Sequence, residues 1–188
     1  MSSNQDNQEQ YRSGPPQGEN YVGEAADEEA APDEAALEFE APVQWRMAKS
    51  LETLRAHINS MAPSRSKVSD GGIGDPAHAS RKSDHNPWVD LQNNKGVVTA
   101  RDFTHDPTGG CDASVLAEQI RASRDPRVKY IIWNRRIANS SPIGSTAAWE
   151  WRPYGGANPH NHHVHISVQP ERGKYDSEEP WNVQSLTS

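Results

Sequence analysis

The chain has 188 residues, a formal net charge of −7 and one cysteine. This length allows one ordinary domain with extensions. The lone Cys111 excludes an internal disulfide and a cysteine-based zinc cluster, and no apolar run approaches the length of a transmembrane helix.

The negative charge is concentrated in residues 1–42. This segment holds eleven Asp and Glu against the single Arg12, about −10, and hardly any large apolar side chains. Because it cannot bury enough surface to offset its ordering entropy, we predict a disordered acidic tail. The rest of the chain has fifteen acids and eighteen bases, about +3, so the folded part is expected to be mildly basic. The first five residues lack the basic and apolar regions of a signal peptide.

Order is expected to begin near Trp45. Apolar residues recur from there at helical spacing until Pro63, which predicts a helix packed on a sheet. The residues that set this spacing are Trp45, Ala48, Leu51, Leu54, Ile58 and Met61. A loop-rich region, 62–94, comes next. Residues 96–103 then alternate like a strand, with Val98, Ala100 and Asp102 on one face.

The second half of the chain reads as one helix followed by strands. Asp112 suits the N-cap of a helix that runs to about Ser123. The β-prone run 128–133 predicts a central strand, and residues 149–151 a short edge strand. With a domain at 43–170 and a C-terminal arm at 171–188 pinned by Trp181, we predict an α+β fold: a small antiparallel sheet with helices packed on one side.

Four of the eight histidines fall within residues 160–165. On a strand, side chains at i and i+2 share a face. His163 and His165 are therefore expected to point to one side, with the β-branched residues Val164, Ile166 and Val168 on the other, and His162 exposed. This alternation indicates a sheet that presents two imidazoles to one ion.

Two earlier residues complete a possible donor set. His85 lies in a Ser-Asp-His-Asn-Pro loop, and Asp102 shares its strand face with the small Ala100. Nitrogen and oxygen donors from His85, Asp102 and the distant His163-x-His165 pair form a set that zinc accepts. We therefore expect a zinc site.

The spaced pattern Ser83-x-His85, Ala100-x-Asp102 and His163-x-His165 resembles the zinc peptidases of the D-Ala-D-Ala metallopeptidase, lysostaphin and hedgehog-like group. Within that group it is most similar to the D-Ala-D-Ala-type peptidoglycan peptidases and the penicillin-insensitive murein endopeptidases. The runs 158–165 and 132–136 are similar to phage domains of endolysin type.

The resemblance implies a role for each matching residue. His85, Asp102 and His165 would bind zinc, which lowers the pKa of a bound water to about 7. His163 would be the catalytic residue beside the metal and take the proton. An arginine that holds the substrate carbonyl is expected, with Arg65 and Arg81 as candidates. Ser83 would orient a ligand or cap its loop.

The chain also departs from that pattern. Residues 86–101 separate His85 from Asp102, so a loop around Trp88–Lys95 must be inserted. Three other residues therefore compete with Asp102 as the third ligand, namely Asp90, His105 and Asp106.

Further side chains near the histidines have two interpretations each. His160 would either line the site or serve the turn after Pro159. The aromatic residues Trp149, Trp151 and Tyr154 would either form a substrate wall or belong to the core.

The function that follows is a zinc-dependent peptidase that hydrolyses peptide bonds in peptidoglycan, as a D-Ala-type endopeptidase or carboxypeptidase. The protein would be a monomer made in the cytoplasm that acts at the bacterial cell wall, with a holin or a virion as its partner. The alternative is a catalytically silent, zinc-containing module that binds the wall or the virion. A His-Asn-His-type nuclease, suggested by Asp84-His85-Asn86-Pro87, is less favoured because no suitable helix follows His85 and a charge of about +3 is small for nucleic acid.

Overall fold

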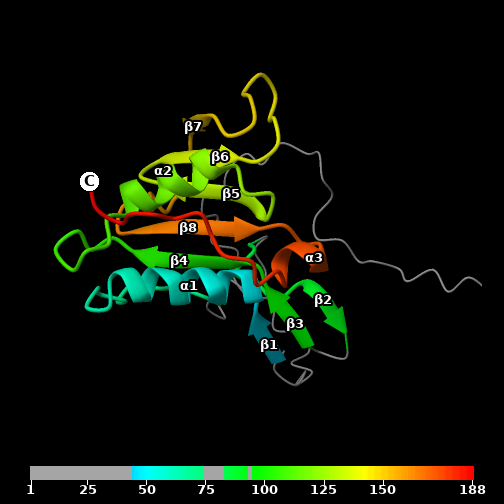
Figure 1. Cartoon of the computed structure of the whole chain (residues 1–188). Coiled ribbons are helices and arrows are strands. Elements are labelled where there is room, and N and C mark those ends of the chain that lie inside the picture. Colours follow the sequence, from blue (N-terminus) through cyan, green and yellow to red (C-terminus); the bar gives the residue numbers. More distant parts are fainter. Residues whose placement is uncertain (1–43, 74–82, 93–94) are drawn as a thin grey trace, which may run out of the picture.

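Two small sheets and three helices make up the computed structural model, which describes residues 44–73, 83–92 and 95–188 (Figure 1). The expected acidic tail, residues 1–42, and the candidate Arg81 lie outside the described residues. The α+β class predicted above is confirmed at this level.

The larger sheet has five antiparallel strands in the order β4-β8-β5-β6-β7. Their bounds are β4 Ala100–Thr104, β5 Val128–Trp133, β6 Arg136–Asn139, β7 Trp151–Pro153 and β8 His163–Val168. The β-prone run at 128–133 is the central strand, as predicted. The expected edge strand is also present but begins at Trp151, because Trp149 adopts a left-handed backbone with a φ of 66°.

The smaller sheet was not anticipated. Its strands are β1 Gln44–Met47, β2 Val89–Gln92 and β3 Lys95–Val98, with β1 parallel and β2 antiparallel to β3. The inserted segment after His85 is therefore the β2–β3 hairpin. The predicted strand 96–103 is wrong as a single element, because the chain leaves the small sheet at Thr99 and enters the large one as β4.

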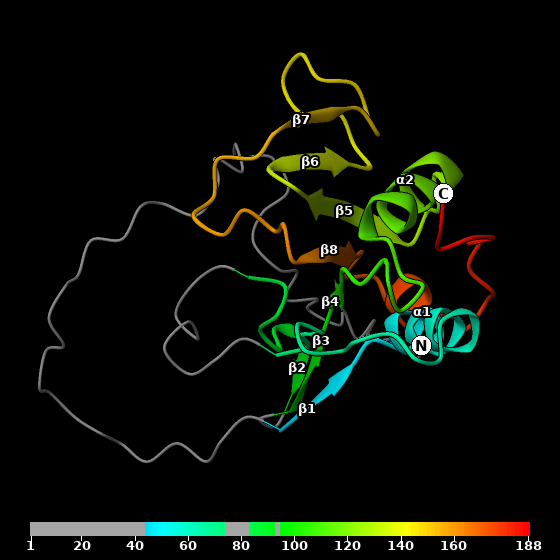
Figure 2. The ribbon, with the colours of Figure 1, turned by 90° about the vertical axis from the view of Figure 1, so that its left-hand side faces the viewer.

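Two helices cover one face of the five-stranded sheet (Figure 2). They are α1 Lys49–Met61 and α2 Ala113–Ser123. The predicted stripe of α1 is confirmed at Leu51, Leu54 and Ile58, which are fully buried, and each such side chain contributes about 1.5–3 kcal/mol. Trp45 is an exception: it lies on β1 and is 44% exposed.

The N-cap of α2 is the predicted one. The Asp112 carboxylate accepts a hydrogen bond from the Ser114 amide at 2.7 Å. Such a cap contributes about 1 kcal/mol because it satisfies an amide that the helix itself leaves free. At the other end, Arg124 takes the left-handed conformation and ends the helix.

The C-terminal segment follows the short helix α3 Arg172–Tyr175 and runs along α1 and α2 on the helical side of the sheet (Figure 2). Trp181 is 3% exposed and donates from Nε1 to the Ser50 carbonyl at 2.8 Å. The Arg127 guanidinium lies 4.0 Å from the centre of the same indole. These contacts tie the end of the chain to the core.

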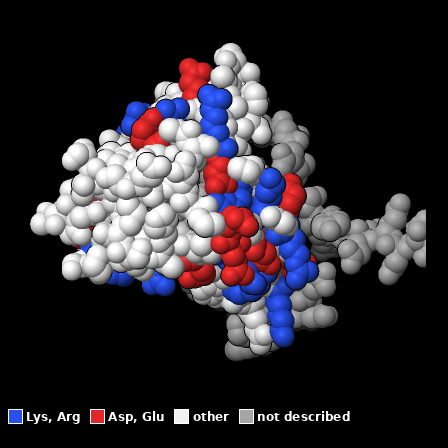
Figure 3. Space-filling model, in the orientation of Figure 1, with Lys and Arg blue, Asp and Glu red and all other residues white. Residues whose placement is uncertain are grey.

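Basic and acidic side chains gather together on the face of Figure 3, over α3 and the beginning of α1. Arg46 pairs with Asp176 at 2.7 Å, and Lys49 with Glu178 at 2.9 Å. Among the described residues of this face the charges are therefore mixed rather than of one sign. None of the described helices is long and apolar enough to span a lipid bilayer.

Candidate metal centre

The face of the large sheet opposite the helices carries the predicted metal ligands. In the antiparallel pairing of β4 with β8, Asp102 lies directly opposite His165, and Thr104 opposite His163. Directly paired residues point to the same face. Val164, Ile166 and Val168 point the other way into the helical core, which confirms the alternation predicted for this strand.

Three ligand atoms converge at this face. His165 Nδ1 lies 3.1 Å from His85 Nε2 and 3.1 Å from Asp102 Oδ1. The third separation, His85 Nε2 to Asp102 Oδ1, is 3.4 Å. The two strands supply Asp102 and His165, while His85 comes from the loop before β2, far away in the sequence.

Several contacts hold the His85 loop against the sheet. The Asp84 carbonyl accepts from the Thr99 amide at 3.1 Å, and the Asp84 carboxylate pairs with Lys129 of β5 at 2.9 Å. The Ser83 hydroxyl accepts from the His85 amide at 3.3 Å, so Ser83 caps the loop backbone. The loop is thus anchored on Thr99, just before β4, and on β5.

The tautomer of His85 follows from its partner. Its Nδ1 lies 2.7 Å from the Gly72 carbonyl, which can only accept a hydrogen bond. In the neutral ring Nδ1 therefore carries the proton, and Nε2, which faces His165 and Asp102, keeps its lone pair; only the protonated ring can donate from Nε2 to Asp102. The neutral form is the arrangement that a metal-ligating histidine needs.

His165 has a corresponding partner behind it. Its Nε2 lies 2.9 Å from the hydroxyl of Ser167, two residues further along the same strand face. The Tyr130 ring stacks on the imidazole with 5.4 Å between centroids and 9° between planes. His165 is 4% exposed, so its orientation is set by packing as well as by the hydrogen bond.

A glycine makes room for the third ligand. The Asp102 amide donates to the Gly71 carbonyl at 2.9 Å, which brings segment 71–72 alongside β4. A β-carbon at position 71 would lie 2.7 Å from Asp102 Oδ2. Gly71 is therefore required for this close approach rather than for a special backbone angle.

The charges in the group stabilise one another. Burial opposes ionisation of Asp102, but hydrogen bonds and positive charge from His165 and His85 outweigh it and hold the pKa of Asp102 well below its usual range. Burial likewise opposes protonation of His85, but the bond and charge of Asp102 leave the pKa of His85 above its ordinary value. Asp102 is thus ionised at neutral pH and ready to act as an oxygen donor.

His163 and His160 complete the cluster without joining the convergent set. His163 Nε2 is buried, lies 3.7 Å from Asp102 Oδ2 and has no hydrogen-bond partner among the described residues. The His160 ring stands edge-on to His163, 5.2 Å between centroids, and its Nδ1 lies 2.9 Å from the Asn158 carbonyl. Burial lowers the pKa of His163, and burial together with the charge of His165 lowers the pKa of His160 to about 3. Both rings are therefore neutral at pH 7.

His85, Asp102 and His165 could hold a metal ion. Ligands at about 2.0–2.1 Å from a tetrahedral ion stand about 3.3–3.4 Å apart. The observed separations of 3.1, 3.1 and 3.4 Å are close to this value. The orphaned nitrogen of His163 also indicates that the cluster is built around a group additional to its own side chains.

The other ligands considered from sequence are engaged elsewhere. Asp106 accepts from the amides of Ser66 and Gly109, and His105 accepts from the amide of Ala113. Asp90 lies 3.4 Å from the Tyr175 hydroxyl. In the described part of the chain, the convergent group contains none of the three.

The structure does not bring Arg65 to the site, contrary to expectation. Its guanidinium is fully buried and forms a bidentate pair with Asp70, at 2.8 and 2.6 Å, plus a 2.9 Å bond to Asn59. The same Asp70 accepts from the amide and hydroxyl of Thr104 on β4. Arg65 therefore supports the loop beside the sheet and is unavailable to a substrate carbonyl.

The aromatic candidates divide between the two faces. Trp151 donates from Nε1 to Glu118 of α2 at 3.2 Å, and Trp149 is buried in the helical core, so neither forms a substrate wall. Tyr154 lies on the metal face, 5.3 Å from the His160 ring and packed on Ile132 and Ile137. His162 is exposed just before β8, as predicted.

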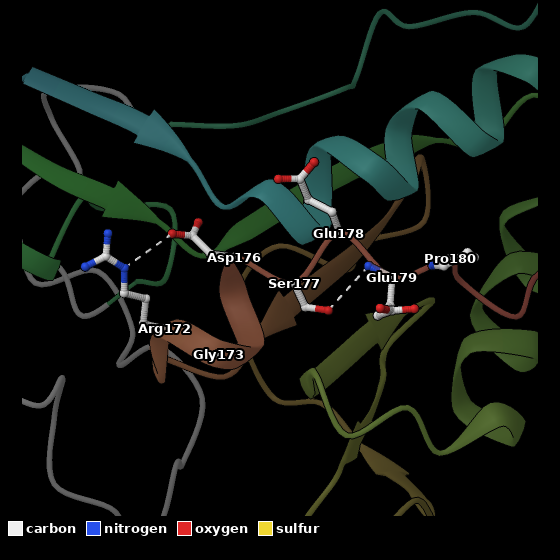
Figure 4. A pocket seen from close by; sticks show the side chains of 7 residues that line it. All are labelled: Arg172, Gly173, Asp176, Ser177, Glu178, Glu179 and Pro180. Atoms are coloured by element: carbon white, nitrogen blue, oxygen red, sulfur yellow. Dashed lines mark hydrogen bonds and ion pairs between the residues drawn. The ribbon is translucent and has the colours of Figure 1, made fainter.

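A pocket away from this cluster has no comparable chemistry (Figure 4). Two of its acids are already paired, Asp176 with Arg46 and Glu178 with Lys49. It is lined by Arg172, Gly173, Asp176, Ser177, Glu178, Glu179 and Pro180.

Four supporting residues escaped the sequence analysis. Ser167 could have been found, because it lies two residues from His165 on a predicted strand. Gly72, Lys129 and Tyr130 carry no such signal, since each reaches the site only through tertiary packing.

Comparison of the chain with protein-family models, with curated proteins and with solved structures gave no match.

Proposed function

We propose that this protein is a zinc-dependent peptidase that hydrolyses peptide bonds in peptidoglycan. The observation that carries the proposal is the convergence of His85, Asp102 and His165 within 3.4 Å of one another. Beside them lies the buried Nε2 of His163, which has no hydrogen-bond partner among the described residues. This donor set suits zinc, and the motif spacing resembles that of the D-Ala-D-Ala metallopeptidase, lysostaphin and hedgehog-like group.

The residues have distinct tasks in this proposal. His85 Nε2, Asp102 Oδ1 and His165 Nδ1 would hold the zinc ion. When bound, zinc supplies a Lewis acid and an activated water for attack on a peptide carbonyl. His163 takes up a proton at Nε2 and returns it to the departing amine, a task for which its lowered pKa leaves it in the required neutral form.

The support for the specific substrate comes from the resemblance, and the place of action follows from it. We propose that the protein acts at the bacterial cell wall, with a phage holin or a virion as its partner. The positively charged group expected near the carbonyl is not Arg65, because the Asp70 pair occupies it.

Two measurements test the proposal. Metal analysis should find about one zinc per chain, lost in His85→Ala and in His165→Ala, because ligand loss removes a large part of the binding free energy. The zinc-loaded protein should clear a turbid suspension of murein sacculi, and mass analysis of the released muropeptides would name the bond.

His163→Ala should keep the zinc and lose the clearing activity. His162→Ala is the matched control, since it removes an exposed histidine one residue away and should behave like the parent protein. Retention of zinc without any clearing by the parent protein would instead identify the silent, wall-binding alternative.

A further inference from the structure

One cross-strand row connects the metal centre to the far edge of the large sheet. Asp102 pairs with His165, His165 with Ile132, Ile132 with Ile137, and Ile137 with Arg152. Because directly opposed residues share a face, Arg152 points to the same side as the metal ligands. Asn139 lies on that face too, opposite Tyr130.

Arg152 is only partly satisfied on this face. Its Nη2 donates to Asn139 Oδ1 at 3.2 Å, and its Nε is buried without a hydrogen-bond partner among the described residues. A guanidinium offers five donors, and leaving a buried donor unpaired is unfavourable. Arg152 as a whole is half-buried rather than sealed in the core.

Arg101 also has a buried Nε without a hydrogen-bond partner among the described residues. What sets Arg152 apart from other buried or half-buried arginines is therefore the lack of a carboxylate partner. Arg65 pairs with Asp70, Arg101 with Glu52 and Arg127 with Asp125, each at 2.6 Å. No carboxylate of the described residues forms such a pair with Arg152. The surroundings of Arg152 therefore suit the binding of an anionic ligand.

The geometry sets the position of that partner. From β8 to β7 there are three strand spacings of about 4.8 Å, so Arg152 stands roughly 14 Å from the metal centre. An extended peptide advances about 3.3 Å per residue, and about four residues span this distance. Tyr154 packs against the cluster of Tyr130, Ile132 and Ile137 on this face, so the peptide would pass over its ring.

We propose that Arg152 is a specificity-determining residue that binds a substrate carboxylate about four residues from the bond that is cut. This inference rests on the proposed peptidase function and adds the requirement for a remote anionic group. Asn139 orients the guanidinium and is a positioning residue.

The test compares two forms of one cross-linked peptide from murein, with free carboxylates and with the carboxylates converted to amides. For the parent enzyme, KM should be about tenfold lower for the free form, since hydrogen bonds to a charged group contribute about 1.5 kcal/mol or more. Arg152→Gln should erase this difference while the zinc content stays that of the parent protein. Arg152→Lys should retain part of it.

Arg136→Gln is the matched control. Arg136 is on the neighbouring strand with the same charge, but it stacks on Trp151 on the opposite face, 5.0 Å from the ring centre. Arg136→Gln should show the same difference in KM between the free and the amide form as the parent enzyme. The inference would be overturned if Arg152→Gln kept the full KM difference between the two peptide forms, or if Arg136→Gln lost as much of it as Arg152→Gln.

Calorimetric binding of both peptides to zinc-loaded His163→Ala separates this inference from the proposed function. In one outcome the parent protein hydrolyses neither peptide, yet His163→Ala binds the free form more tightly and the added Arg152→Gln change abolishes that preference. The Arg152 site then stands and the peptidase proposal fails. If hydrolysis occurs but binding shows no Arg152-dependent preference, the peptidase proposal stands and the Arg152 site is refuted.

Discussion

Replacing Ser167 by alanine should weaken zinc binding about 10- to 100-fold. The Ser167 hydroxyl is 2.9 Å from His165 Nε2 and is fully buried, so no water can take its place without rearrangement. Partners that orient a metal-ligating imidazole typically contribute this factor, which corresponds to about 1.4–2.7 kcal/mol.

A hydroxyl suits position 167 because it can donate or accept. Without an ion and with His85 neutral, His165 Nδ1 lies between the acceptors Asp102 Oδ1 and His85 Nε2, so it carries the proton and Nε2 accepts from Ser167. With an ion on Nδ1, the proton moves to Nε2, which then donates to Ser167. An alanine side chain can neither donate to His165 Nε2 nor accept from it. In both states this buried nitrogen is left unpaired, which costs about 1–3 kcal/mol.

The assay has two parts, zinc affinity by competition with a chromogenic chelator and thermal unfolding of the metal-free protein. Ser50→Ala is the matched control, because Ser50 is equally buried but its hydroxyl has no partner among the described residues. That change should leave zinc affinity unaltered and stability equal or higher. Parent-like zinc affinity in Ser167→Ala would refute the reasoning.

Two further perturbations test the same geometry. Gly71→Ala should lower zinc affinity roughly tenfold, because the new β-carbon would lie 2.7 Å from Asp102 Oδ2 and displace that ligand; Gly173→Ala, where nothing lies within 4 Å, should have no effect in the same chelator competition. The metal-free protein should lose stability as the pH falls from about 6.5 towards 3, because His160, whose pKa is lowered to about 3, stays neutral while the unfolded chain binds a proton. In His160→Gln, the unfolding free energy measured with urea should depend less on pH over that range. An unchanged pH dependence would contradict the lowered pKa of His160.

Sequence patterns predicted the structure correctly where it depends on residues that are near one another in the chain. The alternation of 163–168 correctly placed two imidazoles on one face, and Asp112 was correctly identified as a cap, since both depend on residues within a few positions. The same reasoning failed at residues 96–103 and at Trp45, because a strand's extent and a helix's start were set by a second sheet with no local signal.

Arg65 shows that the role of a single side chain is hard to predict from its sequence position. Its upstream position suggested a substrate contact, but Asp70 and Asn59 surround it in the folded chain. Conversely, Lys129 and Tyr130 sit in an ordinary β-prone run, yet one anchors the His85 loop and the other stacks on His165.

The residue types and spacing alone determined which atoms are able to bind a metal, because imidazole and carboxylate donors are properties of single residues and strand alternation has a fixed period. Only the tertiary structure decided that His85 joins Asp102 and His165, since an 80-residue separation is closed by strand pairing and by the Asp84–Lys129 contact rather than by local preference. It also decided the row that ends at Arg152, because the register across five strands emerges only when all of them pair.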